Sequence, residues 1–90
     1  MQKLLLDPPK VSIMMAEAAT GFILLKDGSP YEGDGDIWWV MDSLDEAKDF
    51  ITDQLKTNDS REFVVFDHQG APVWAENREG RQVVDAGKEQ

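Results

Sequence analysis

Three segments of this 90-residue chain are apolar at every position, and they limit its possible folds more than any other feature. The segments cover residues 22–25, 37–41 and 63–66, and their β-branched and aromatic content is typical of strands. A strand with one solvent-exposed face alternates apolar and polar residues, because successive side chains point to opposite faces of the sheet. We therefore expect a sheet that carries large apolar side chains on both faces, each of which needs a cover.

The clearest helical pattern in the chain begins at Ser43. Ser43 and Glu46 form a Ser-x-x-Glu capping box, which is typical of a helix start. Apolar residues then recur on one face of a helix with a period of about 3.6 residues. These apolar residues are Leu44, Ala47, Phe50, Ile51 and Leu55. The pattern predicts one amphipathic helix over residues 43–57, which packs on one face of the sheet.

The predicted elements follow the order β-β-β-α-β-β along the chain. Strands are expected at residues 11–15, 22–25 and 37–41 before the helix, and at residues 62–67 and 73–75 after it. This order indicates an α+β fold, with a single mostly antiparallel sheet of four or five strands and one amphipathic helix on one face. We expect an N-terminal arm at residues 1–10, a single domain at 11–78 and a polar C-terminal tail at 79–90.

The sheet face opposite the helix needs a second cover. The candidates are the arm with Leu4-Leu5-Leu6, the tail with Val83-Val84, and another protein chain. Trp38 and Trp39 are neighbours on one strand, so their side chains point to opposite faces, and at least one is expected outside the helix-packed core. Two interpretations stay open. Either the arm folds over the sheet, or the open face is an interface, which would most simply be that of a homodimer.

Acidic side chains dominate the charge of the chain. Eighteen acidic residues face nine basic ones, which gives a formal net charge of −9 and an isoelectric point near 4.3. Nucleic-acid phosphates and anionic lipids repel such a chain, so we expect neither nucleic acid nor a membrane as a partner. A basic protein partner is electrostatically favoured, unless the acidity serves only solubility.

The acids concentrate in residues 26–53, which hold nine acids against Lys26 and Lys48. Asp45, Asp49 and Asp53 recur every four residues on the outer side of the predicted helix. Like charges at that spacing destabilise a helix by about 0.2–0.5 kcal/mol per pair. Because these aspartates bring this cost with no gain in stability, the pattern favours a basic partner. The predicted partner-binding residues are Trp38, Trp39, Asp34, Asp36, Asp45, Asp49 and Asp53.

The chain carries few residue types that support catalysis. It has no cysteine and one histidine, His68, which lies at a predicted hairpin turn, so cysteine and multi-histidine metal sites are excluded. Asp34 and Asp36, in a glycine-rich loop, are candidate ligands for a cation, although their spacing does not match a calcium-binding loop. We therefore expect no enzymatic activity and no cofactor. A metal-dependent activity at this loop, with His68, is kept as an alternative.

The early apolar run of the chain is short. Leu4-Leu5-Leu6 is closed at once by Asp7-Pro8-Pro9, whereas a secretory core needs about 7–15 apolar residues and a spanning helix about 20. This pattern predicts a cytoplasmic protein.

Three short stretches resemble small acidic bacterial domains of uncharacterised function, some of which look like immunity proteins that bind and silence a toxin. The stretches are residues 35–40, 43–47 and 66–70, and the resemblance covers roughly residues 22–77. It implies a non-catalytic binding role and transfers no site residues. The sequence therefore predicts a non-enzymatic acidic protein-interaction module, either an inhibitor or an immunity-type protein that binds a basic partner. The alternative is a homodimeric structural domain whose acidity serves solubility.

Overall fold

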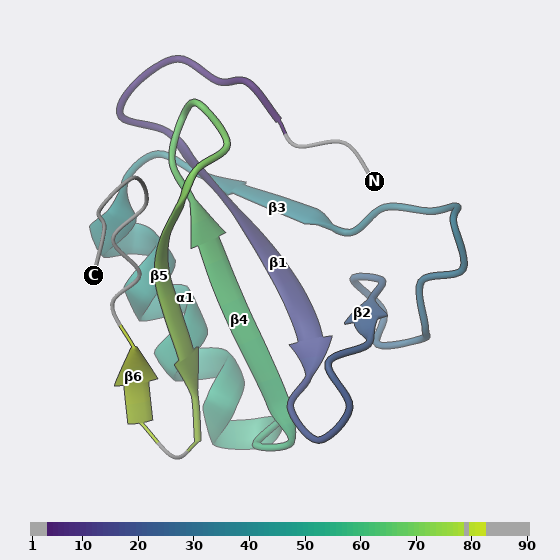
Figure 1. Ribbon diagram of the computed structural model, residues 1–90. Coiled ribbons are helices and arrows are strands. Elements are labelled where there is room, and N and C mark those ends of the chain that lie inside the picture. The colour runs from purple at the N-terminus through teal and green to yellow at the C-terminus, as the bar shows by residue number, and fades with distance from the viewer. Residues whose placement is uncertain (1–3, 79, 83–90) are drawn as a thin grey trace, which may run out of the picture.

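The fold is an antiparallel sheet with one helix, as the computed structural model shows for residues 4–78 and 80–82 (Figure 1). This arrangement confirms the predicted α+β class. The elements are β1 (Val11–Glu17), β2 (Ile23–Leu24), β3 (Trp38–Met41), α1 (Leu44–Thr57), β4 (Arg61–Phe66), β5 (Pro72–Asn77) and β6 (Gly80–Gln82). The predicted order β-β-β-α-β-β is followed by β6, a short sixth strand inside the segment that we assigned to the tail.

β1 lies at the centre of the sheet. β4 pairs with one edge of β1, while β2 and β3 share the other edge, and β5 and β6 extend the sheet beyond β4. All of these pairs are antiparallel, so β3 and β4 run parallel to each other with β1 between them. α1 connects β3 to β4 and crosses one face of the sheet on the way (Figure 1).

α1 begins where the sequence predicts. The Glu46 backbone N–H donates to Ser43 Oγ at 3.2 Å, which makes Ser43 the N-cap. The Glu46 carboxylate accepts from the Asp42 backbone N–H at 3.1 Å, one residue before the N-cap, so the box closes on Asp42. The helix ends at Asn58, whose N–H donates to the carbonyl of Gln54 at 2.9 Å.

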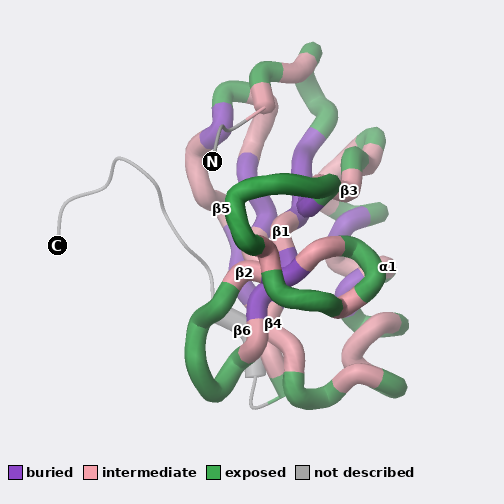
Figure 2. Tube along the Cα trace, turned by 90° about the vertical axis from the view of Figure 1, so that its right-hand side faces the viewer, coloured by how far each residue is buried: buried purple, intermediate pink, exposed green. Residues whose placement is uncertain are grey.

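The main core lies between α1 and the sheet. Register places Ile13, Phe63 and Val65 on the face toward the helix, and all three are fully buried. Ala47 and Ile51 from α1 are equally buried against them. In Figure 2, α1 lies on one side of the sheet. The apolar stripe of the helix therefore covers one sheet face only, as expected.

The opposite sheet face also carries apolar side chains, as the unalternating segments predict. Met14 pairs with Trp38 on one side and with Val64 on the other, so all three share this face. These side chains are half-buried and Val40 beside them is 47% exposed, whereas Ser12 and Phe66, which pair on the same face, are buried. We call this the open face. Trp38 therefore lies outside the helix-packed core, which confirms that one tryptophan does.

The N-terminal arm is fixed to the turn between β4 and β5. The Leu6 backbone N–H donates to the His68 carbonyl at 2.8 Å. Leu4 and Leu6 are half-buried, whereas Leu5 between them is 81% exposed. The other candidate cover within this chain, Val83-Val84, lies outside the described residues.

β2 is shorter than the predicted strand at 22–25. Phe22 precedes it and is 67% exposed. After Leu24 the chain turns back, because the Leu25 N–H donates to the Ser29 carbonyl at 2.8 Å and Leu24 bridges to Pro30. This tight turn ends the strand, although Leu25 is as apolar as its neighbours.

Candidate functional site

Three exposed carboxylates follow one another along the outer side of α1. Asp45, Asp49 and Asp53 are all exposed, and none of them forms an ion pair within the part of the chain that the structure describes. Lys48, three residues after Asp45, turns toward the sheet and places its Nζ 4.0 Å from the centre of the Trp74 ring. We call Asp45, Asp49 and Asp53 the aspartate stripe. Its charge is not neutralised by direct pairing.

Lys48 on α1 stabilises the packing of the helix on the sheet. Trp74 is 5% exposed, and its Nε1–H donates to a Glu76 carboxylate oxygen at 3.2 Å. The Lys48 ammonium therefore lies over the face of the Trp74 ring, while the Nε1–H at the edge of that ring is hydrogen-bonded to Glu76. Such cation–π contacts stabilise by about 0.5–2 kcal/mol, which keeps Lys48 directed toward the sheet.

Asp36 helps to start β3. One of its carboxylate oxygens accepts from the Trp38 backbone N–H at 3.3 Å, and the other lies 3.2 Å from Lys26 Nζ. The hydrogen bond from Trp38, followed by that from Lys26, lowers the pKa of Asp36 below its ordinary value. Asp34, two residues earlier, is exposed and makes no hydrogen bond or ion pair with any described residue. Of the two loop aspartates, Asp36 has a structural role and Asp34 has none.

The loop that carries these acids has a defined shape. Asp27 accepts from both the backbone N–H and the hydroxyl of Ser29, at 2.9 and 2.6 Å, and these bonds lower the pKa of Asp27. Gly35 has a positive φ of 111°, and a Cβ there would lie 2.6 Å from a methyl group of Leu25. The loop therefore packs closely on the end of the Leu25 side chain, and the positive φ favours glycine at position 35.

The two tryptophans predicted as anchors are in different environments. Trp39 packs in the core, with its ring centroid 5.3 Å from that of Phe50 and 6.4 Å from that of Phe63. Trp38 lies on the open face, where its ring meets Phe66 edge-on at 5.5 Å. Of the two, Trp38 is therefore the one beside the open face, with Val40 as its exposed neighbour.

The sheet separates the predicted partner-binding residues. The aspartate stripe lies on the outer side of α1, behind the sheet in Figure 1, and Trp38 lies on the face in front. One flat partner surface cannot contact both at once. The predicted partner-binding residues are therefore divided between two surfaces.

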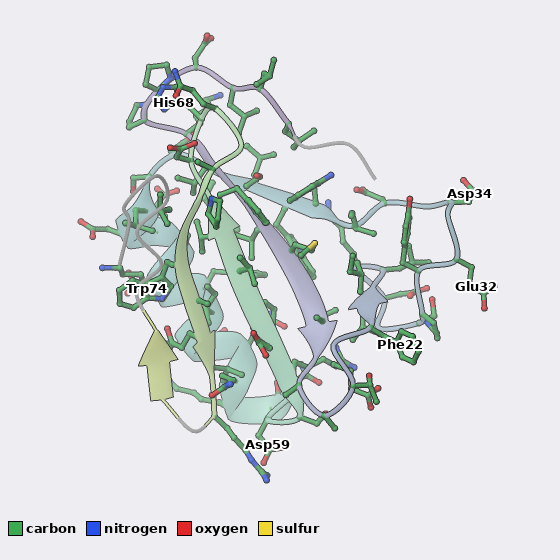
Figure 3. All side chains as sticks on the ribbon, viewed as in Figure 1. Phe22, Glu32, Asp34, Asp59, His68 and Trp74 are labelled. Carbon is green, nitrogen blue, oxygen red and sulfur yellow. The ribbon has the colours of Figure 1, made fainter. Side chains whose placement is uncertain are left out.

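The residues of the metal alternative are not brought together. His68 and Asp34 lie at opposite ends of the molecule (Figure 3), and no group of three or more potential metal ligands occurs among residues 4–78 and 80–82. His68 lies in the β4–β5 turn, where Asp67 accepts from the backbone N–H groups of Gln69 and Ala71 at 2.8 and 2.9 Å. The Ala71 bond is the main cause that lowers the pKa of Asp67.

Sequence reasoning missed one surface feature, the outer edge of β3. β3 pairs with β1 on one side, and no described strand pairs with its other side. Val40 and Asp42, at this edge, were not among the predicted site residues. The strand order decides which strands have a free edge, and nothing local in the sequence specifies that order.

Comparison with protein-family models, with curated proteins and with solved structures finds no match to this chain. Among the described residues, no helix has the length and apolar character needed to span a membrane.

Proposed function

We propose that this protein is a non-enzymatic acidic interaction module that binds a basic protein partner, as an inhibitor or immunity-type protein does. The observation that carries the proposal is the aspartate stripe. It combines three exposed like charges at four-residue spacing with a neighbouring lysine that is directed to Trp74 instead. A cytoplasmic location belongs to the same proposal, and fractionation of the native cells tests it.

Exposed charges of this kind act mainly on the rate of association. A surface rich in one sign of charge attracts a partner of opposite sign and raises the association rate, and salt weakens the effect. A carboxylate at the rim of an interface adds little affinity by itself. We therefore expect a basic partner whose association with the stripe slows strongly as the ionic strength rises.

The test is capture of partners from the native cells by the tagged protein and by an Asp45→Asn/Asp49→Asn/Asp53→Asn variant. The expected partner is basic, and the variant retains much less of it than the wild type does. A control variant changes the net charge by the same amount outside α1, at the exposed carboxylates Asp7, Glu32 and Asp59. This control should capture the partner nearly as well as the wild type.

Two results would contradict the proposal. Equal capture by the wild type and the stripe variant would show that the stripe does not contribute. An acidic captured partner would show that the charge argument is wrong. Stopped-flow association of the purified partner at several salt concentrations then measures the expected loss of rate directly.

The open face supports a second candidate, a homodimeric structural domain whose acidity serves solubility. Val40 is 47% exposed and adjoins the half-buried Trp38 and Met14, so apolar surface remains accessible there. Two-fold dimers are the commonest oligomers and bury such surfaces. Light scattering at micromolar concentration separates the two candidates, since a stable dimer supports the second and a monomer removes it.

A further inference from the structure

Within the part of the chain that the structure describes, no strand pairs with the outer edge of β3. In an antiparallel sheet, every second residue of an edge strand directs its backbone N–H and C=O groups away from the sheet. Natural proteins commonly protect such edges with lysine, proline or a bulge. Trp38–Met41 carry none of these three, and the pairing of β3 with β1 is regular over all four residues, so its short length is the protection that this strand itself shows. The register directs the backbone groups of Trp38 and Val40 away from β1. The Trp38 N–H already donates to Asp36, so the groups that no described residue pairs at this edge are the Trp38 C=O and the N–H and C=O of Val40.

Apolar side chains adjoin this edge on the open face. Val40 is 47% exposed, and Trp38 is held half-buried by its edge-on contact with Phe66. A strand added beside β3 would place every second side chain on this face, next to Val40. The edge thus combines backbone hydrogen-bonding groups with an apolar contact.

Carboxylates stand at both ends of β3. The Asp36 carboxylate bonds to the first residue of the strand and its side chain is 70% exposed, while Asp34 is exposed on the same loop. Asp42 follows the last residue of the strand and is also exposed. Asp36 is paired with Lys26, whereas Asp34 and Asp42 form no ion pair with any residue that the structure describes. Negative charge therefore flanks the edge on both sides.

This charge pattern favours a basic segment over a second copy of the chain. If two β3 edges paired antiparallel about a two-fold axis, Asp36 of each copy would approach Asp42 of the other. Like charges facing each other across a strand pair are destabilising, and each copy carries a net charge of −9. A positively charged segment would instead be attracted at both of its ends.

We propose that the free edge of β3 accepts an extended basic segment of a partner protein, which adds to the sheet as a further strand. The segment carries lysine or arginine near both ends and apolar residues between them. Its basic residues are about 20 Å apart, because about six residues separate Asp36 from Asp42 at about 3.3 Å each. In strand addition of this kind, backbone hydrogen bonds supply the affinity and every second side chain supplies the specificity. The proposal rests on the proposed function and names a surface that the basic partner uses.

The test uses a synthetic peptide with arginines at both ends and alternating valine and threonine between them. Its matched control is the same peptide with N-methyl groups on alternate residues, which keeps the charge and removes backbone donors from one edge. We expect the N-methylated peptide to bind at least about tenfold more weakly in fluorescence anisotropy. In the full-length ¹⁵N-labelled protein, the unmodified peptide should shift the backbone amides of residues 38–41.

Two variants with the same charge change separate local from general electrostatics. Asp42→Asn should weaken binding of the unmodified peptide about two- to fivefold at low salt, and the difference should fade in about 0.5 M salt. Asp59→Asn should leave it unchanged, because Asp59 lies at the opposite end of the sheet from β3 (Figure 3). Circular dichroism spectra verify that both variants are folded.

Failure of this proposal is distinguishable from failure of the proposed function. In one contrary outcome, the two peptides bind with equal affinity and shift only the amides of the aspartate stripe. That result would overturn strand addition but would still agree with the proposal of a basic partner. If the protein is a homodimer and dilution shifts the amides of residues 38–41, the edge pairs with a second copy of the chain. That result would also overturn the proposal. Absence of binding at millimolar peptide would also overturn it, whatever the partner capture shows.

Discussion

Substitution of Asp49 by asparagine tests whether the aspartate stripe destabilises the folded protein. Asp49 is the middle member of the stripe, four residues from both Asp45 and Asp53, and it forms no ion pair with a described residue. Neutralising it removes both like-charge repulsions at once. Asp45 keeps its place in the first turn, where the helix dipole favours a negative charge.

The size of the effect follows from the spacing. Each like-charge pair at this spacing costs about 0.2–0.5 kcal/mol, so the two pairs predict a gain of about 0.4–1 kcal/mol for Asp49→Asn. Asparagine and aspartate have similar intrinsic helix propensities, which leaves the electrostatic change as the main contribution. In a domain of this size, that gain corresponds to a rise in Tm of about 2–8 °C.

The gain is measured by urea denaturation and thermal melting at several salt concentrations. It should be largest at about 0.01 M salt and should fade near 1 M, where the screening length drops to about 3 Å. Asp49→Lys should stabilise further, because it converts both repulsions into attractions. Asp7→Asn is the matched control, since Asp7 lies in the arm outside any helix and loses one charge in the same way.

A particular result would refute this reasoning. If Asp49→Asn is neutral or destabilising at low salt while Asp7→Asn is unchanged, the stripe carries no cost for folding. The inference that its charges serve a partner would then lose its energetic basis.

Three further predictions concern the local structure around the candidate surfaces. Ser43→Ala removes the N-cap acceptor of α1 and should cost about 1 kcal/mol of unfolding free energy in urea. Gly35→Ala should destabilise more than Gly33→Ala in thermal melts. Both glycines have positive φ, but only the new methyl group at position 35 would meet Leu25, at 2.6 Å. The pKa of Asp67 is lowered by folding, so its stabilising contribution is present above its ordinary pKa near 4 and is lost as the pH falls through the lowered value. Asp67→Asn should therefore flatten the dependence of stability on pH in acid, measured by denaturation from about pH 5 downward.

Local signals in the sequence predicted where α1 begins, and they predicted that β2 exists but not how short it is. The start of α1 depends on Ser43 and Glu46, which are three residues apart, and its buried face depends on a short-range period. The end of β2 depends on the hydrogen bond from Leu25 to Ser29 and on the bridge from Leu24 to Pro30. The apolar run continues for one residue, Leu25, into that turn, so hydrophobicity alone could not show that the strand ends at Leu24.

The candidate surfaces depend on strand order, which the sequence did not specify. Alternation along a strand predicts that Trp38 and Trp39 face opposite ways, and they do. Which of the two meets the helix depends on the register of β3 on β1, and therefore on residues about 25 positions earlier in the chain. The outer edge of β3, which no described strand pairs, likewise exists because β2 and β3 share one side of β1 and β4 occupies the other.

The structure divides the acidity of this protein into two kinds. Asp27, Asp36 and Asp67 accept backbone hydrogen bonds in turns or at a strand start. These bonds are the main cause that lowers the pKa of Asp36 and of Asp67, whereas the Ser29 hydroxyl is the main cause for Asp27. Their charge is needed where it is, whatever the protein binds. The aspartate stripe accepts no such bond from any residue that the structure describes, and repulsion within it opposes the helix that carries it. Solubility would be served equally by carboxylates spaced apart or paired with lysine. The close spacing of the stripe is therefore the part of the charge that neither folding nor solubility requires, and the proposal of a basic partner depends on it.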